Sequence, residues 1–378
     1  MNAKYLMLSA VRCGVSTASA LFRLLRRRGN RVVFLSRQSD TPSENFRMLD
    51  EKLHELCPGI KTEYSCRLGL KQSMGLSYIP LLLRQLWMMA GARACVTESY
   101  CPPISLPRSH GSLRVVQIWH SMVAIKKFGW QTVGMAEGSD EDTAKAMRMH
   151  AGYSAIVCGS EYQRSLFAEA MNTPEEKIYA LGMPSADRLL AADREAAREA
   201  VLREYPQLRG KRVIAYLPTM RRGRAVPWQE LAAALESRDD MRGKYALVIG
   251  LHPLDAHTER SSDGHDVIFD GSLGSRTLLL GCDAVISDYS GAAAEAALCG
   301  RELYFYVPDI DEYSGECGLN IDPLELFGEI SASGGEAMAR IMAASYPNGA
   351  IERCREILAG GCDGRSAERI ARLILEDE

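Results

Sequence analysis

The stretch around which the chain is organised reads Cys282-Asp283-Ala284-Val285-Ile286-Ser287-Asp288-Tyr289-Ser290-Gly291-Ala292-Ala293-Ala294-Glu295. Its apolar run predicts a strand over 284–286, and the alanine-rich segment predicts a helix after Gly291. The turn between them carries hydroxyls and a glycine. The free N–H groups of the first helical turn and the positive end of the helix dipole would make it an anion site. The alternative is an ordinary helix start, capped by Asp288 or Ser290.

Short apolar strands alternate with helical segments along the rest of the chain. In the second half, strands are predicted over 212–217, 245–251, 267–269, 284–286 and 302–307. In the first half, strands are predicted over 5–10, 32–35, 94–97, 114–119, 155–158 and 178–181, and helices over 16–28, 43–56 and 160–171. This alternation predicts parallel sheets covered by helices. The expected fold class is α/β, with two Rossmann-like domains in series.

The length of 378 residues is too great for one core and indicates two domains. A charged, alanine-rich helix over 187–205 is the predicted connector. It separates an N-terminal domain, 1–186, from a C-terminal domain, 187–378. An amphipathic helix over 365–375 could pack back on the N-terminal domain. A GxGxxG sequence is absent, which disfavours a dinucleotide site.

The composition is that of a soluble globular protein, with 47% hydrophobic and 25% charged residues and a net charge of -3. This charge gives no overall attraction to nucleic acid, and no nucleic-acid partner is expected. The 11 cysteines form no CxxC pair and no cluster with zinc spacing, which predicts free thiols in a reducing cytoplasm. The first apolar run is too short for a secretory signal. The sequence contains no run of about 20 apolar residues, so no transmembrane helix is expected.

Two segments bear on membrane association. Residues 75–94 are rich in Leu, Met and Trp and are interrupted by Pro80 and Arg84. They predict either a buried helix or a helix lying in a membrane interface, with Arg84 and Arg93 at the headgroups. Residues 23–31 contain five arginines, which favours contact with an anionic lipid surface.

Polar and ionisable side chains collect where the predicted strands end: His120, the group Arg221, Arg222 and Arg224, His252, and the turn with Ser287, Asp288 and Ser290. Residues just past the carboxyl ends of strands line the ligand crevice in open α/β sheets. Guanidinium groups, imidazoles and helix N-termini together suit phosphate. Taken singly, the histidines could be packing residues and the arginines a solvated loop. No metal is predicted, because the strand ends offer few carboxylates and no Walker A sequence is present.

Taken in order, these segments resemble the CDP-glycerol glycerophosphotransferase family, which comprises teichoic acid primases and polymerases. The matching motifs run from about residue 115 to 375, and the preceding part matches only in general pattern. The resemblance is carried by Gln117-Ile118-Trp119-His120 with Lys126-Lys127-Phe128-Gly129, Tyr216-Leu217-Pro218-Thr219-Met220-Arg221, Leu251-His252-Pro253, Ser287-Asp288-Tyr289-Ser290, Asp309 to Tyr313, and Asp363-Gly364-Arg365-Ser366-Ala367-Glu368-Arg369.

The resemblance implies a GT-B-like fold, in which the parallel sheets of two Rossmann-like domains face a central cleft. It implies transfer of a polyol phosphate, above all glycerol phosphate, from CDP-glycerol or CDP-ribitol to a hydroxyl of a polyprenyl-diphosphate-linked acceptor. CMP would be released, and no metal or other cofactor is expected. The N-terminal domain would face the acceptor and the C-terminal domain would bind the CDP donor. The protein would lie peripherally on the cytoplasmic face of the cell membrane.

The resemblance implies that His120 matches the histidine that acts as general base in the family. A neutral imidazole with a pKa near ~6.5 suits this role. His252 and Arg221 would bind and polarise the pyrophosphate, and Asp309 and Glu312 would position polyol or ribose hydroxyls. Stabilisation of the departing CMP would come from the same donor contacts. The residues implied to hold the donor phosphates and nucleotide are Thr219, Arg221, Arg222, Ser287, Asp288, Ser290 and Gly291.

The chain departs from the family pattern at several motif positions. Ser121 stands in place of a glycine, Ser185 in place of an arginine and Gly291 in place of a second serine. Cys317 also departs from the pattern. Two alternatives therefore stay open. One is a GT-B glycosyltransferase that uses a nucleotide sugar, and the other is a catalytically degenerate member that binds nucleotide or polymer.

Overall fold

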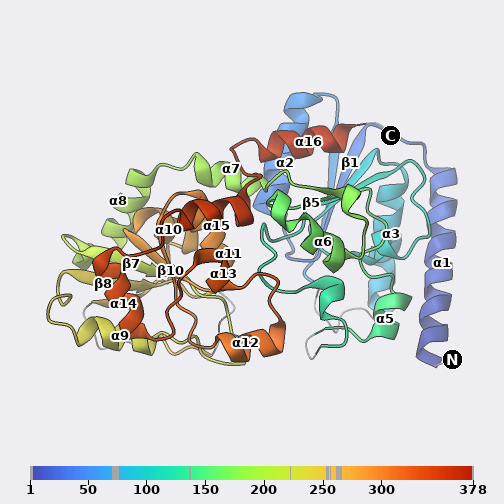
Figure 1. Ribbon diagram of the computed structural model, residues 1–378. Coiled ribbons are helices and arrows are strands. Elements are labelled where there is room, and N and C mark those ends of the chain that lie inside the picture. The colour runs from blue at the N-terminus through green and yellow to red at the C-terminus, as the bar shows by residue number, and fades with distance from the viewer. Residues whose placement is uncertain are drawn as a thin grey trace. The chain divides into compact units, whose positions relative to one another are not determined.

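The computed structural model describes residues 3–69, 76–135, 138–221, 223–252, 255, 257–260 and 266–376 (Figure 1). The chain divides into two compact units. Unit 1 comprises Met1–Asp187 together with Gly360–Glu378, and unit 2 comprises Arg188–Ala359. The C-terminal segment thus belongs with the N-terminal part of the chain, and each unit has a sheet of its own.

Unit 1 is built on a six-stranded parallel sheet with the strand order β2-β1-β3-β4-β5-β6. Its inner strands are runs of apolar residues buried on both faces, which is typical of parallel sheets covered by helices. On β1, Val33 and Leu35 point into one core, and Val32 and Phe34 point into the other. The strands are β1 (Arg31–Ser36), β2 (Lys61–Cys66), β3 (Ala94–Thr97), β4 (Arg114–Gln117), β5 (Ala155–Val157) and β6 (Ile178–Tyr179).

Helices cover both faces of this sheet. Met88 and Met89 of α3 pack into the core that contains Val33. On the other face α16 packs against α2, as Figure 1 shows, and contributes Ile370 and Ile374 to the core. The helices are α1 (Ala3–Leu25), α2 (Glu44–Leu56), α3 (Ile79–Ala90), α4 (Pro102–Ser105), α5 (Glu141–Ala146), α6 (Arg164–Met171), α7 (Pro184–Leu190) and α16 (Ser366–Leu375), with 3-10 turns η1 (Leu76–Tyr78), η2 (Gly129–Thr132), η3 (Glu161–Gln163) and η4 (Glu175–Lys177).

The strand predicted over 5–10 is wrong, because α1 is helical from Ala3 to Leu25. Ala, Leu and Met favour helix, and β1 already has a strand on each side, so this segment finds no edge to join there. Residues Met7–Leu25 also form a helix that is long and apolar enough, by length and composition, to cross a membrane. No such helix was predicted, because Arg12 and Arg23 interrupt the apolar residues.

Unit 2 contains a five-stranded parallel sheet with the order β11-β10-β7-β8-β9. All five strands predicted in this half are present, so the prediction of two parallel α/β sheets is confirmed. The strands are β7 (Arg212–Tyr216), β8 (Tyr245–Ile249), β9 (Val267–Phe269), β10 (Ala284–Ser287) and β11 (Glu302–Phe305). The helices are α8 (Arg194–Glu204), α9 (Gln229–Glu236), α10 (Ser275–Gly281), α11 (Gly291–Leu298), α12 (Ile310–Cys317), α13 (Pro323–Phe327), α14 (Gly334–Ala343) and α15 (Ala350–Ala359), with the 3-10 turn η5 (Pro206–Leu208).

Two further elements differ from the predictions. The single connecting helix predicted over 187–205 is two helices, α7 and α8, and the carboxylate of Asp193 caps α8 by accepting hydrogen bonds from the N–H groups of Glu195 and Ala196. Strand β2 was not predicted, because Lys61–Cys66 is a polar edge strand without an apolar run.

Candidate active site

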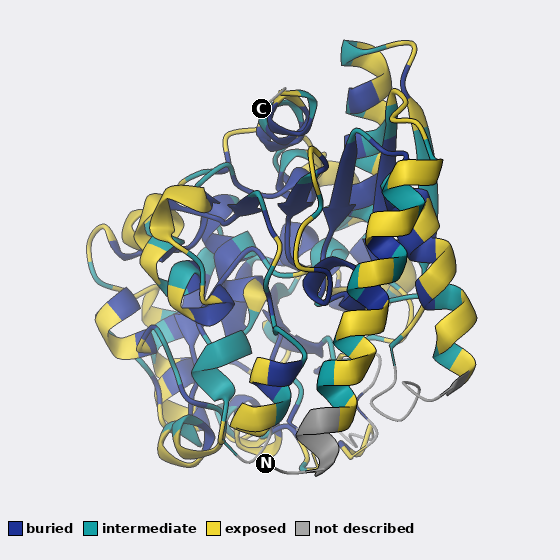
Figure 2. Ribbon diagram, turned by 90° about the vertical axis from the view of Figure 1, so that its right-hand side faces the viewer, coloured by how far each residue is buried: buried dark blue, intermediate teal, exposed yellow. Residues whose placement is uncertain are grey.

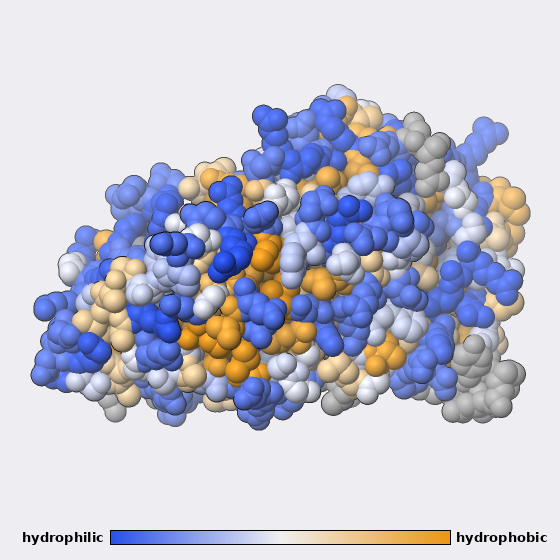
Figure 3. Space-filling view, in the orientation of Figure 1, coloured by the Kyte–Doolittle hydropathy of each residue, from blue (hydrophilic) through white to orange (hydrophobic). Residues whose placement is uncertain are grey.

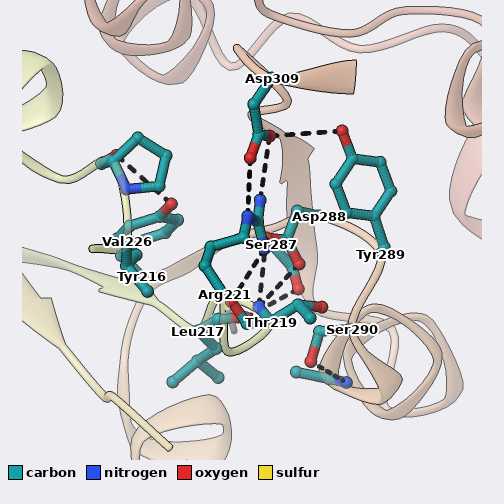
Figure 4. A network of polar contacts seen from close by, with 12 residues as sticks. Tyr216, Leu217, Thr219, Arg221, Val226, Ser287, Asp288, Tyr289, Ser290 and Asp309 are labelled. Carbon is teal, nitrogen blue, oxygen red and sulfur yellow. Dashed lines mark hydrogen bonds and ion pairs between the residues drawn. The ribbon is translucent and has the colours of Figure 1, made fainter. Parts of the chain in front are cut away.

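The turn after β10 is tied to the turn after β7 by two buried side chains. The hydroxyl of Ser287 donates to the carbonyl oxygen of Leu217 at 3.0 Å. The carboxylate of Asp288 accepts from the backbone N–H of Thr219, with N···O distances of 2.9 and 3.1 Å. Because β7 and β10 are hydrogen-bonded neighbours, these contacts hold the two predicted motif turns together at the carboxyl edge of the sheet (Figure 4).

Arg221 is the centre of this network and is almost completely buried. Its Nη1 lies 2.9 Å from the carboxylate of Asp288 and donates to the carbonyl oxygen of Thr219 at 2.8 Å. Its Nε and Nη2 form a bidentate pair with Asp309, at 2.7 and 3.0 Å. Burial opposes the charge, but the two carboxylates outweigh burial and raise the pKa of Arg221 above its ordinary value.

Two aromatic rings complete the surroundings of this guanidinium. The Arg221 guanidinium carbon lies 5.2 Å from the ring centre of Tyr289 and 4.8 Å from that of Tyr313. The two rings stack on each other with centroids 4.3 Å apart. Arg221 therefore contacts protein groups on every side, and its contacts hold the turns that carry Thr219 and Ser290. Its predicted part in binding the donor phosphate stays a prediction.

Ser290 begins α11 as its N-cap, and its hydroxyl oxygen accepts from the N–H of Ala292 at 3.2 Å. Gly291 follows at the exposed start of the helix, with open space where a Cβ would lie. Figure 4 draws Thr219 between Arg221 and Ser290. The Thr219 hydroxyl is buried and has no hydrogen-bond partner among the described residues. This turn thus combines a helix N-terminus with an unused hydroxyl donor.

The predicted polyol-binding residues are engaged in ion pairs. Asp309 holds Arg221, and the hydroxyl of Tyr289 lies 3.5 Å from its carboxylate. Glu312 pairs with Arg224, which also contacts Glu316 at 2.8 Å. Asp309 therefore belongs to the buried network, and Glu312 to a surface group beside it.

Two further residues predicted to act on the donor are His252 and Arg222. His252 is exposed and follows β8, the strand next to β7. Arg222 lies outside the described residues. Within unit 2 the structure thus joins Thr219, Arg221, Ser287, Asp288 and Asp309 into one network. Ser290 and Gly291 follow in the same turn, and His252 stands at the neighbouring strand end.

His120 lies in unit 1, just past β4. The residue before it, Trp119, has a φ of 55°, a left-handed conformation that side chains larger than glycine rarely adopt. The Trp119 and His120 rings are in contact, with centroids 4.2 Å apart. The His120 ring keeps an exposed edge, but the surrounding protein desolvates it and lowers its pKa below the usual value, with a further lowering by the Lys126 ammonium. A neutral imidazole is the form that can accept a proton.

Glu98 lies behind His120 and was not among the predicted site residues. Its carboxylate accepts from the hydroxyls of Ser36 and Ser43, each at 2.6 Å, and is buried. Its carbonyl oxygen lies 3.2 Å from Nδ1 of His120, and the side-chain amide of Gln38 lies 3.2 Å from the same nitrogen. Burial raises the pKa of Glu98, while the two serine hydroxyls lower it. The signal for Glu98 was its position directly after the predicted strand over 94–97.

Two of the motifs join the C-terminal segment to the rest of unit 1. The Asp187 carboxylate caps α16 by accepting from the N–H groups of Ser366 and Ala367, at 2.9 and 2.8 Å. Arg369 pairs with Asp363 at 2.7 Å and donates to the carbonyl oxygen of Gly361 at 2.5 Å. Ser185, which replaces a family arginine, is buried. These motifs therefore have a structural part here.

The described residues contain no group of three or more His, Cys, Asp or Glu side chains that could hold a metal ion. That no metal or other cofactor takes part in the reaction stays a prediction. The polar groups that the described residues do bring together are guanidinium, hydroxyl, carboxylate and helix N–H groups.

Two parallel α/β units with polar residues at the carboxyl edges of their sheets define a GT-B-like fold. The structure is similar to that of the wall teichoic acid polymerase TagF, with a TM-score of 0.69 and 16% sequence identity over 99% of this chain and 98% of that one. It is also similar to the MnaA–UDP structure from S. aureus, with a TM-score of 0.55 and 11% identity over 93% of this chain and 99% of that one. At these identities the likeness concerns the fold.

The sequence matches the family described as CDP-glycerol:poly(glycerophosphate) glycerophosphotransferase over residues 17–376, and the chain belongs to this family. It is 29% identical to the teichoic acid ribitol-phosphate primase of Bacillus spizizenii, over 94% of this chain and 93% of that protein. It is 26% identical to the teichoic acid glycerol-phosphate primase of the same organism, over 63% of this chain and 62% of that protein. It is 24% identical to the poly(ribitol-phosphate) polymerase, of which it spans 58%.

Proposed function

We propose that the protein transfers a polyol phosphate from a CDP-activated polyol to a hydroxyl of a membrane-lipid-linked acceptor in teichoic-acid-like polymer synthesis, with release of CMP. Family membership over residues 17–376 is the observation that carries this proposal. The donor is CDP-glycerol or CDP-ribitol, since primases for both polyols are among the relatives.

On the donor side, the turn at Ser290 and Gly291 would receive the diphosphate. The first-turn N–H groups of α11 and its dipole favour negative charge. The Thr219 hydroxyl, buried without a partner among the described residues, supplies a further donor. The Arg221–Asp288 pair keeps these groups in place, and preorganised donors of this kind stabilise the charge that develops on the leaving CMP. His252, at the adjacent strand end, would assist the same charge.

On the acceptor side, His120 would take the proton of the attacking hydroxyl. In the tautomer in which Nδ1 carries the proton and donates to the Glu98 carbonyl oxygen, 3.2 Å away, Nε2 is unprotonated and is the base. The acceptor oxygen forms a bond to the phosphorus that bears the polyol. The bond from that phosphorus to the CMP oxygen breaks, and CMP leaves with the electron pair.

A membrane surface suits the exposed face of unit 1. Figure 2 shows α1 with much of its outward face exposed, and Figure 3 shows hydrophobic side chains among hydrophilic ones along the right-hand edge, over α1. The exposed apolar residues of α1 and α3 include Met7, Val11, Leu21, Leu24, Leu25, Ile79, Leu83 and Trp87. With Arg23 and Arg84 on the same helices and Arg26 directly after α1, they form a surface suited to anionic lipid.

The test is to incubate the protein with a lipid-linked acceptor and either CDP-glycerol or CDP-ribitol and to measure CMP. Release of CMP from one donor is expected. His120→Ala should lower turnover by about 10²-fold or more and leave CDP affinity nearly unchanged. His54→Ala, at an exposed histidine of the same unit, serves as the matched control. Absence of CMP with both donors would overturn the proposal.

The donor-binding residues can be tested separately from turnover. Ser290→Ala and Thr219→Val should each weaken CDP binding about tenfold, because a hydrogen bond to a charged group is worth about 1.5–3 kcal/mol. Ser237→Ala, at an exposed serine at the end of α9, should have no effect. Unchanged CDP affinity in both site variants would show that the donor binds elsewhere.

A further inference from the structure

Unit 1 contains a cavity of about 100 Å³ at the carboxyl edge of its sheet, beyond the ends of β1 and β2. Its walls include Ser36, Arg37, Arg67, Tyr78, Leu81 and Gln85. A void of about 10–15 Å³ already holds one water molecule, so this cavity has room for a phosphate group. It lies at the edge where ligands bind in open α/β sheets, and none of the roles assigned above uses it.

Two arginines give this cavity a positive charge. Ser36 and Cys66 are partners in the β1–β2 register, so Arg37 and Arg67 leave adjacent strands side by side. The Arg67 N–H donates to the carbonyl oxygen of Ser36 at 3.0 Å, which keeps the strand ends together. In the part of the chain that the structure describes, neither guanidinium forms an ion pair with a carboxylate. Paired guanidinium forks without carboxylate partners are suited to phosphate oxygens.

The cavity wall is shaped to hold Arg37. A Cβ on Gly69 would lie 2.6 Å from Nε of Arg37 and 2.7 Å from its Nη2. The guanidinium therefore rests directly on the Gly69 backbone, and the Gly69 N–H donates to the carbonyl oxygen of Arg37 at 2.9 Å. The Arg37 N–H in turn donates to the hydroxyl of Ser99 at 3.0 Å. These contacts fix the chain on both sides of the arginine.

The cavity adjoins the His120 site along the chain. Residues 36, 37 and 38 are consecutive, and consecutive Cα atoms are about 3.8 Å apart. Ser36 donates to Glu98, and the Gln38 amide lies 3.2 Å from Nδ1 of His120. Arg37 stands between them and lines the cavity. The residue that binds the ligand is thus the direct chain neighbour of a residue that contacts the imidazole.

Two leucines stand beside the arginines in the cavity wall. Leu81 of α3 and Leu68 line the cavity, and Leu68 is exposed. The exposed residues Ile79, Leu83 and Trp87 lie on the opposite face of α3 from Leu81, because residues two apart in a helix point to opposite sides. The surroundings of the arginines are amphiphilic because Leu68 and Leu81 form part of the cavity wall beside them.

We infer that Arg37 and Arg67 bind a phosphate group of the lipid-linked acceptor, with the start of its apolar chain against Leu68 and Leu81. The ligand class is a phosphate ester carried on a long apolar chain. Its identification as the acceptor rests on the proposed function. The binding itself does not, and it can be measured without turnover.

The experiment titrates the full chain with farnesyl diphosphate, inorganic pyrophosphate and farnesol in separate arms of an isothermal titration. Farnesyl diphosphate is expected to bind most tightly, because it supplies both the anion and the apolar chain. Arg37→Ala and Arg67→Ala should each weaken its binding about tenfold or more, and Arg37→Lys should fall between. Lys61→Ala, an exposed lysine at the opposite end of β2, is the matched control and should bind like the wild type.

Farnesyl diphosphate binding that is unchanged in Arg37→Ala and Arg67→Ala would overturn the inference. Equal affinity for pyrophosphate and farnesyl diphosphate would overturn the assignment to a lipid-linked ligand. CDP binding in unit 2 should be the same in all variants, and it reports that they are folded. Failure of the proposed function has a different signature, since it is the absence of CMP release from both donors.

Discussion

The guanidinium of Arg221 lies 2.9 Å from the carboxylate of Asp288, and both side chains are buried. The pair joins the turn after β7 to the turn after β10, and Asp309 closes the arrangement from the segment after β11 with a bidentate contact. Three neighbouring strands of one sheet thus meet in one buried ion-pair network. This network is what gives the candidate donor site its shape.

Arg221→Ala should destabilise unit 2 strongly. Removal of one partner of a buried ion pair leaves an uncompensated charge and costs about 3–5 kcal/mol, and here two carboxylates lose their partner. The free energy of unfolding from urea titration is the measurement. Arg224→Ala removes a guanidinium that pairs with exposed glutamates and should cost under about 1 kcal/mol. Similar losses in both variants would mean that the network does not organise the unit.

The rate should depend on the charge of His120. The active base is the neutral imidazole, so activity is present above its pKa and is lost as the pH falls through it. Desolvation and Lys126 lower this pKa below its usual value, so the acid limb of kcat/KM should lie below about 6.5. Lys126→Ala removes a charge that disfavours the imidazolium, so the limb should move to higher pH.

Lys127→Ala is the matched control for this experiment, since it removes an exposed charge from the adjacent position. It should leave the acid limb where it is in the wild type. An acid limb that is the same in the wild type and in Lys126→Ala would contradict the assignment of His120 as the group that titrates.

Gly182 should not tolerate a side chain. Its φ is 77°, and a Cβ would lie 2.5 Å from Oγ of Ser366 and 2.7 Å from the carbonyl oxygen of Gly361. Gly111 has a φ of 63°, but there a Cβ would meet only Arg23 at 3.7 Å. Left-handed strain costs about 1–2 kcal/mol at either position. Gly182→Ala should therefore be the more destabilising in urea titration, because the clash would push the C-terminal segment away from the rest of unit 1. Equal losses of unfolding free energy in the Gly182→Ala and Gly111→Ala variants would show that the structure accommodates the added Cβ at Gly182 without further destabilisation.

The exposed residues of α1 should contribute to lipid binding. Leu24 and Leu25 are 85% and 64% exposed, and full burial of a leucine is worth about 1.5–3 kcal/mol. Leu24→Ser combined with Leu25→Ser should weaken binding to anionic vesicles at least about tenfold in a flotation assay. Leu324→Ser, at a 48% exposed leucine of unit 2, should not. Unchanged vesicle binding in the α1 variant would show that this helix does not contribute to lipid binding.

The secondary structure was predicted best where an apolar run is short and bounded by turns. The strands of unit 2 lie where they were predicted, although β7 ends one residue earlier, β8 and β11 end two residues earlier, and β10 ends one residue later. The failures have a common cause. The first helix was taken in part for a strand because six residues cannot distinguish a strand from a helix, and β2 was missed because an edge strand needs no apolar run.

The candidate site was only partly predictable. The motif residues Asp288, Arg221 and Asp309 were singled out, but as ligand contacts. That they also bind one another depends on the strand order β11-β10-β7, which no local pattern contains. Glu98 and Gln38 were missed for the same reason, since they meet His120 only through the pairing of β1, β3 and β4.

The sequence by itself determined the alternation of strands and helices, the two-unit α/β architecture and membership of the family, because periodicity and motif order are local properties of the chain. The tertiary structure alone decided which charged groups are neutralised inside the protein and which are left to face a ligand. Arg221 forms ion pairs with Asp288 and Asp309, while Arg37 and Arg67 have no carboxylate partner among the described residues. The difference arises because an ion pair needs its two groups within about 4 Å, and only the folded register of the strands brings distant residues that close.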